Sequence, residues 1–300
     1  MNNEYLLYTG ALRVFKDFSV SKCNDFVIEH DTVNSQYKTL QDKYPVREVA
    51  GEGDDFSKVT RLMRWVHDHV LHNGGIKDVE FISKDSVSIL DYAYGKGVEF
   101  GVYCRLQAIV LTECCLSIGL PARTIHCLPF SPNDFESHVV SMVYIKDLNK
   151  WVLFDAGNNA YLTDINKTPL SPLEARVLLG LDECFVNDSL PYYQCDFHEK
   201  QMFYKQYMAK NLFYIKFSAR NTFGTDLVEG QRTYHLIPLG FNVKEREIAY
   251  CEYAIRNSPE QLKGDWEKAL EGFKTQERRI VSQEQFFSTY PNETELISYL

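Results

Sequence analysis

The sequence predicts an α+β fold in which helices of the first half pack on an antiparallel sheet formed further along the chain. Apolar residues recur at helical spacing at Phe56, Val59, Leu62, Met63, Val66 and Val70. Three runs rich in β-branched and aromatic residues follow, "ARTIHCLPF", "SHVVSMVYI" and "KWVLFDA", and such runs are typical of strands. Because helices come first and strands second, we expect α+β.

Three helices are expected before these strands. The first begins after Asp54 or Asp55, which serves as its N-cap. The second lies in "DSVSILDYAYGKG", and the third runs from about Cys104 to Ser117, where "GLP" ends it. The last two strands flank the short polar turn "KDLN", so they are predicted to form an antiparallel hairpin.

The remaining segments give weaker patterns. The N-terminal region holds two short β-rich pieces, "ALRVF" and "DFVIE". Past the strands, "SPLEARVLLGL" predicts a helix, "RTYHLIPLGFNV" a strand and "SPEQLKGDWEKALEGFKTQERRI" an amphipathic surface helix, while "FYKQYMAKNLFYIKFSA" fits either type. We expect one elaborated domain over residues 1–300, with an N-terminal elaboration at 1–53, a core at 54–170 and a C-terminal extension at 171–300.

Composition excludes some classes of function. A formal net charge of −9 argues against broad electrostatic binding of nucleic acid or of an anionic membrane surface, because both need basic patches. No window approaches the roughly 18 uninterrupted apolar residues of a membrane span, and no signal peptide is evident, so a cytoplasmic protein is expected. The eight cysteines are then expected to be reduced. Nothing in the sequence indicates an oligomeric state.

Cys104 stands where a glycine-containing stretch meets the third predicted helix. The first N–H groups and the dipole of a helix stabilise a thiolate at that position. Arg105 adds a positive charge beside it, and Gly97 and Gly101 allow the backbone to turn sharply just upstream. The alternative is that Cys104 is simply a buried residue that starts a helix.

A histidine and an aspartate follow on the predicted hairpin. His138 opens one strand and Asp155 closes the next, so the three side chains can form a Cys-His-Asp triad. A loop symmetric about Leu148 would place Asp155 on the face opposite to His138, because side chains alternate along a strand. We therefore expect a two-residue loop or one bulge, either of which restores the common face.

These features together resemble the transglutaminase-like superfamily of papain-like cysteine enzymes. The resemblance runs from about Lys58 to Asp164 and rests on four pieces in order, "GVYCRLQAIVLTECC", "GLPAR", "ESHVVSMVYI" and "KWVLFDAGNN". It implies a papain-like core and a thioester intermediate. By this resemblance Cys104 is the nucleophile, His138 the general base and then acid, and Asp155 the carboxylate that orients the imidazole.

A developing oxyanion needs two converging hydrogen-bond donors. The backbone N–H of Cys104 is the first candidate, and Tyr94, with Tyr92 beside it, is a candidate for the second. Gln107, one turn into the helix, is a weaker candidate. Ordinary packing of these tyrosines in the core is at least as well supported by the sequence.

The run "HDHVLH", with His67, His69 and His72, is a rival candidate site. His69 and His72 would share one face of the first helix, but no third ligand follows at a metal-binding spacing. We therefore interpret them, with His67, as surface or helix-capping residues, and we expect neither a metal nor a cofactor. His126 and Cys127 lie on a strand, where Cys127 is expected in the core.

The sequence thus supports two hypotheses. The first is a cysteine-dependent amide hydrolase or acyltransferase that acts on a peptide or peptide-like substrate. The acidic balance slightly favours a cationic or amine-bearing substrate. The second is a binding or scaffold module that keeps the fold without turnover. The family resemblance does not choose between water and an amine as acyl acceptor.

Overall fold

The computed structural model describes residues 3–18, 22–73, 81–96, 100–187, 197–227 and 230–288. Its helices, in chain order, are α1 (Asn3–Val14), α2 (Gln36–Lys43), α3 (Val46–Ala50), α4 (Asp55–His69), α5 (Ser86–Lys96), α6 (Cys104–Ser117), η1 (Lys146–Leu148), α7 (Pro172–Leu181), α8 (Phe197–Asn211), α9 (Val243–Asn257), α10 (Glu260–Thr275) and α11 (Gln283–Phe287).

The strands are β1 (Glu29–His30), β2 (Ala122–Leu128), β3 (His138–Ile145), β4 (Lys150–Phe154), β5 (Leu162–Thr163), β6 (Phe185–Val186), β7 (Tyr214–Ser218), β8 (Arg220–Asn221) and β9 (Thr233–Leu236). Five of them form one sheet in the order β4-β3-β2-β7-β9, and every neighbouring pair in it is antiparallel. The predicted α+β class with an antiparallel sheet is confirmed. Because β7 and β9 come from the C-terminal extension, that extension completes the sheet; the domain boundaries stay a prediction.

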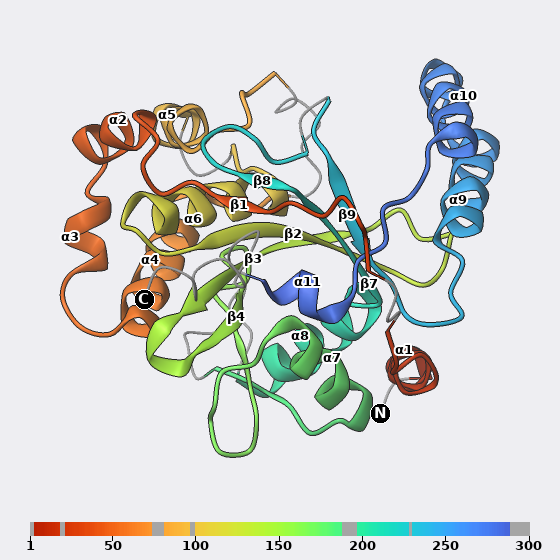
Figure 1. The fold of residues 1–300 in the computed structure, drawn as a ribbon, viewed down its shortest axis with the longest axis horizontal. Helices are drawn as coiled ribbons and strands as arrows, with labels where there is room; N and C mark the ends of the chain where they lie inside the picture. The colour runs from red at the N-terminus through yellow and green to blue at the C-terminus, as the bar shows by residue number, and fades with distance from the viewer. Residues whose placement is uncertain are drawn as a thin grey trace.

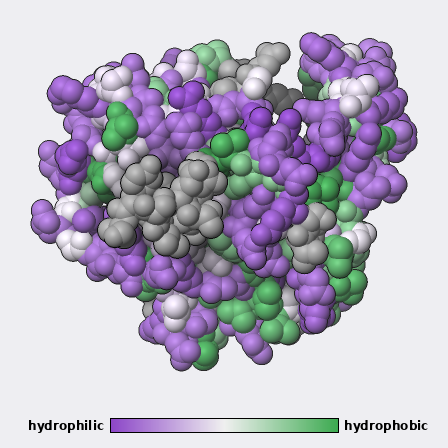
Figure 2. Space-filling view, in the orientation of Figure 1, coloured by the Kyte–Doolittle hydropathy of each residue, from purple (hydrophilic) through white to green (hydrophobic). Residues whose placement is uncertain are grey.

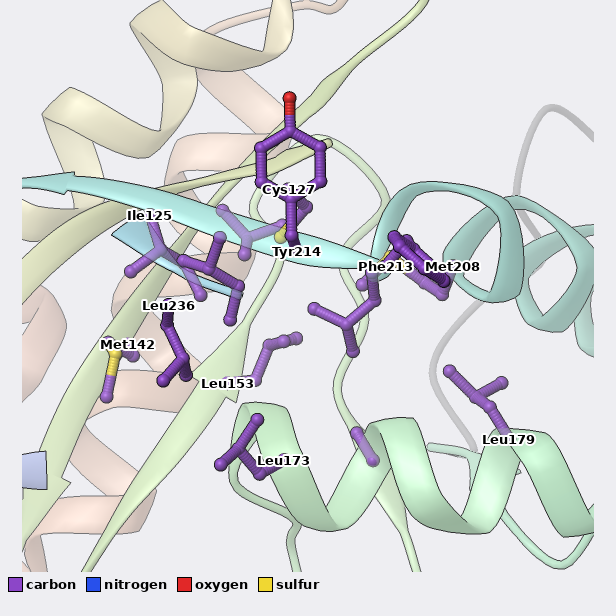
Figure 3. Packing of buried hydrophobic residues seen from close by; sticks show 14 of the residues in the cluster. Ile125, Cys127, Met142, Leu153, Leu173, Leu179, Met208, Phe213, Tyr214 and Leu236 are labelled. Atoms are coloured by element: carbon purple, nitrogen blue, oxygen red, sulfur yellow. The ribbon is translucent and has the colours of Figure 1, made fainter. Parts of the chain in front are cut away.

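The sheet separates two hydrophobic cores (Figure 1). Helices α4, α5 and α6 cover one face, where Val143 and Phe154 meet the apolar side of α6. Helices α1, α7 and α8 cover the other face, and Figure 3 shows Leu173 of α7 on the side that faces Met142 and Leu153 of the strands. A site that draws residues from both layers must therefore lie at an end of the strands.

The loop between β3 and β4 decides which side chains share a face. The strands pair with Ser141 opposite Phe154 and Ile145 opposite Lys150. Four residues therefore connect them, ending with Asn149 in the left-handed conformation (φ 49°). The expected two-residue loop or bulge is wrong, but a four-residue loop is also even in number and has the same effect on the register. His138 and Asp155 thus lie on one face.

The structure corrects one N-terminal prediction and resolves an ambiguity. "ALRVF" is not a strand, since most of it belongs to α1, whose buried side packs on α7 and α8. Only the end of "DFVIE" becomes strand, as β1. The aromatic stretch that fitted either type divides into helix α8 and strand β7. The predicted strand β9 and helices α7 and α10 are confirmed.

The face of the molecule in Figure 2 is mainly hydrophilic. Apolar side chains gather on it over α1 and α7, the helices that contribute exposed Leu7, Val14 and Leu181. In the described part of the chain, no helix has the length and apolar character that a membrane crossing requires.

Candidate active site

Cys104 begins a helix that is otherwise buried. Tyr103 is its N-cap in an extended conformation, and the side chains from Leu106 to Ser117 are all buried, whereas Cys104 is partly exposed. The thiol therefore lies at the accessible N-terminal end of the helix, where unpaired N–H groups and the dipole favour negative charge.

The chain just before Cys104 lies against the segment that follows α4. Val102 N donates to Leu71 O (2.7 Å) and Asn73 N donates to Val102 O (2.8 Å). At Gly101 a Cβ would lie 2.8 Å from both Leu71 O and Asn73 Cβ, so only glycine permits this approach. The turn that was expected to need Gly101 is therefore a site of close backbone contact, while Gly97 lies outside the described residues.

His138 and Asp155 form a buried pair. His138 opens β3, Asp155 follows β4 directly, and Nε2 of the imidazole donates to Oδ2 of the carboxylate at 2.5 Å. The backbone N–H and the side-chain amide of Asn158 also donate to this carboxylate, at 3.1 and 2.9 Å. Asp164, in contrast, accepts from the backbone of its own turn, at Asn166 and Thr168. The structure therefore brings Asp155, and not Asp164, to the histidine.

The pKa values of the thiol and the imidazole are shifted in opposite directions. Burial alone would raise the pKa of Cys104, but the neighbouring imidazoles of His138 and His72 lower it to about 6. Burial alone would lower the pKa of His138, but the charge and hydrogen bond of Asp155, together with Cys104, raise it to about 10. Between those values the pair is a thiolate and an imidazolium.

The two predicted side-chain oxyanion donors make their described contacts away from Cys104. Nε2 of buried Gln107 donates to Val70 O at 2.6 Å. Tyr94 is 51% exposed and stacks on His69, at the rim of a surface cavity that Leu71 and Val102 also line. Among the described contacts, neither side chain is placed against Cys104.

The three histidines of the rival site have different partners in the structure. Helix α4 ends at His69, so the expectation that His69 and His72 share a helix face is wrong. His69 and His67 bond to carbonyls of Trp65 and Ala156, whereas His72 pairs with Val102 across the bridge described above and contacts the Cys104 thiol. This contact could not be predicted from the sequence, because it depends on the path of the chain after α4.

Two tyrosines of α8 complete the surroundings of the histidine, and sequence reasoning missed both. The ring of Tyr207 packs edge-on against the His138 imidazole, with centroids 4.9 Å apart. Tyr204 is fully buried beside Asp155. Burial first, and then the neighbouring Asp155 carboxylate, raise the pKa of its phenol well above the usual value. Their spacing of three residues in the aromatic stretch places them on one helix face, and that spacing was the available signal.

Each of the other cysteines that the structure describes has a raised pKa. Cys114, Cys115 and Cys127 are fully buried, as expected for core residues, and burial raises the pKa of each thiol. Cys23 is partly exposed like Cys104, yet burial and a hydrogen bond to Asp25 raise its pKa. The eighth cysteine, Cys195, lies outside the described residues.

Asp226 ties the C-terminal extension to the start of α6. Its carboxylate accepts from Arg105 Nε at 2.7 Å and from His126 Nε2 at 3.1 Å. Gly224, two residues earlier, donates to buried Glu113 of the same helix at 2.9 Å. His126 therefore shares with Arg105 the carboxylate that holds a loop of the C-terminal extension onto the helix that carries Cys104.

Replacing Asp226 by Ala is expected to lower the free energy of unfolding by about 2 kcal/mol, because it leaves Arg105 and His126 without their shared acceptor. The partial exposure of Arg105 keeps this cost below that of a fully buried pair. Urea denaturation measures the change. Asp42→Ala, which removes an exposed pair with Lys38, is the matched control and is expected to change it by less than about 0.5 kcal/mol. Equal effects of the two variants would contradict a structural role for Asp226.

Comparison with known proteins agrees with the resemblance predicted from the sequence. Residues 43–156 match the sequence model of the Transglutaminase-like superfamily, and the predicted likeness is thereby confirmed for this segment. No curated protein matches the chain significantly. Among solved structures, one described as a "Putative Cysteine Protease" from Cytophaga hutchinsonii is 17% identical, with a TM-score of 0.31 over 62% of this chain. The chain spans 60% of that protein's length.

Proposed function

We propose that the protein is a cysteine-dependent amide hydrolase or acyltransferase of the transglutaminase-like type, acting on a peptide or peptide-like substrate. One observation carries the proposal: a partly exposed cysteine at a helix N-terminus interacts with a buried imidazole that a buried carboxylate holds. A structural cysteine needs none of these partners, whereas a nucleophile needs all of them. A cytoplasmic location stays part of this proposal.

The proposed reaction begins with the Cys104 thiolate. Its attack on the amide carbonyl carbon forms the C–S bond and moves an electron pair onto oxygen. When this intermediate collapses, the C–N bond breaks and the departing nitrogen takes a proton from the His138 imidazolium. Asp155 occupies Nε2, so Nδ1 is the nitrogen left to give that proton. The products of this half-reaction are a thioester, a free amine and a neutral imidazole.

The second half-reaction returns the enzyme to its starting state. Neutral His138 removes a proton from the acceptor as the acceptor attacks the thioester carbonyl. The C–S bond then breaks, and Cys104 leaves as the thiolate beside the reformed imidazolium. Water as acceptor gives hydrolysis, and an amine gives transamidation. Asp155 holds the ring orientation throughout and stabilises the imidazolium.

The activated ester p-nitrophenyl acetate tests this proposal without knowledge of the natural substrate. Wild-type protein is expected to release a rapid burst of p-nitrophenolate and to carry one acetyl group on Cys104, identified by peptide mass spectrometry. Cys104→Ala is expected to show neither. Adding a primary amine then separates the two acceptors, since faster turnover with formation of the N-acetyl amine indicates transamidation, and no change indicates hydrolysis.

Two results would contradict the proposed function. Acetylation spread over several residues, with no preference for Cys104, would remove the evidence for an activated nucleophile. A protein that is acetylated on Cys104 but is not deacylated by water or by any amine would favour the binding or scaffold module.

A further inference from the structure

His72 lies against the active cysteine from a different part of the chain than His138. The segment after α4 is fixed beside Val102 by the two backbone hydrogen bonds at 2.7 and 2.8 Å. His72 is the residue of this segment that pairs with Val102, which precedes Cys104 by two positions. Because Gly101 has no side chain, the segment before Cys104 can approach the segment after α4 closely. The backbone thus holds His72 at the thiol independently of the sheet that carries His138.

The two imidazoles at the thiol have different surroundings. His138 is 2% exposed and bonded to the buried carboxylate of Asp155. His72 is partly exposed and comes from the segment that follows α4. The side chains of both interact with the Cys104 sulfur. Two donors to one sulfur exceed what proton exchange requires, because one imidazole is sufficient to remove and return a proton.

Charge movement during the reaction indicates a use for the second imidazole. When the thiolate attacks, negative charge leaves sulfur and develops on the carbonyl oxygen, which is bonded to the carbon that sulfur has just joined. A donor that hydrogen-bonds the sulfur before attack therefore lies close to the oxygen after attack. His138 cannot fill this role, because its proton goes to the departing nitrogen.

On this basis we propose that the His72 imidazole is the side-chain donor of the oxyanion hole, paired with the backbone N–H of Cys104. The assignment rests on the proposed function and deepens it. It replaces Tyr94 and Gln107, the candidates taken from the sequence, because the described contacts place the side chain of Gln107 at Val70 O and that of Tyr94 against His69, and neither at Cys104. The backbone N–H of Cys104 is available because it belongs to the first turn of α6.

Two reactions at the same sulfur separate oxyanion stabilisation from thiolate stabilisation. Acetylation by p-nitrophenyl acetate passes through an oxyanion, whereas alkylation by iodoacetamide displaces iodide and forms none. In His72→Leu, the rate constant for acetylation of Cys104 is expected to fall about 100-fold. The alkylation rate, compared at equal thiolate fraction, is expected to stay within about threefold of wild type, because it needs only the thiolate.

Further variants exclude a general loss of structure. In His72→Gln the amide also donates, so acetylation is expected to recover to within about 10-fold of wild type. His69→Leu, three residues earlier and bonded to Trp65 O, is the matched control and is expected to leave both rates unchanged. Circular dichroism compares the folding of each variant with wild type.

The outcomes distinguish this inference from the proposed function. If His72→Leu lowers acetylation and alkylation by the same factor, His72 acts on the thiolate or on local structure, and the oxyanion assignment is wrong. If His72→Gln recovers nothing although it folds like wild type, the assignment is wrong as well. If wild-type protein is not acetylated on Cys104 at all, the proposed function itself fails.

Discussion

In the His138→Ala protein, the Cys104 thiol is expected to titrate about two pH units higher than in wild type. The pKa of the thiol is lowered to about 6 in the intact site, and an isolated thiol titrates near about 8.5. The helix N-terminus and His72 remain in the variant, so the value is expected to stop short of that of a free thiol.

The ultraviolet absorbance of the thiolate, with Cys104→Ala protein as the blank, follows this titration. In wild type the absorbance is expected to be lost as the pH falls through about 6, because the thiolate then takes up a proton. At the other end, the imidazolium loses its proton near pH 10, so the ion pair persists between these two values. An unchanged midpoint in His138→Ala would show that the two side chains are not paired.

Asp155→Ala is expected to reduce turnover of p-nitrophenyl acetate about 10³-fold. Burial alone would lower the pKa of His138. The charge and the hydrogen bond of Asp155 are the main causes that raise it instead. Without the carboxylate, the buried ring has no acceptor at Nε2, and burial disfavours the imidazolium that both half-reactions use.

Two further variants show how much of this loss comes from the charge of Asp155 and how specific it is to that carboxylate. Asp155→Asn keeps an acceptor for Nε2 but removes the charge, so its turnover is expected to fall between those of Asp155→Ala and wild type. Asp164→Asn is the matched control, because Asp164 accepts only from its own turn among the described contacts, and it is expected to leave turnover unchanged. Equal losses in Asp155→Ala and Asp164→Asn would contradict the assignment of the carboxylate.

The sequence predicted those parts of the fold and site that local patterns determine. Helix α4 was identified by apolar spacing, and the hairpin β3-β4 by two strand-like runs around a polar turn. Both are short-range signals. The juxtaposition of Cys104 with His138 followed from their order along the chain together with the family resemblance, and the structure places them together.

Contacts that depend on tertiary packing could not be predicted in this way. The predicted length of the β3-β4 loop was wrong, because the residues "KDLN" do not show that all four of them lie outside the paired strands. "ALRVF" becomes helical because α1 packs on α7 and α8, which overrides the strand propensity of valine and phenylalanine. His72 and Tyr207 lie 32 and 103 residues from Cys104 in the sequence, and only the fold brings them near it.

Competitive alkylation of Cys104 and Cys23 tests the central claim most directly. Both cysteines are partly exposed, but the pKa of the Cys104 thiol is lowered to about 6 while that of Cys23 is raised. Limiting iodoacetamide at pH near 6.5, followed by peptide mass spectrometry, is expected to label Cys104 at least 10-fold faster than Cys23. Labelling of Cys104 at or below the rate of Cys23 would show that the thiol is not activated and would contradict the proposed cysteine chemistry.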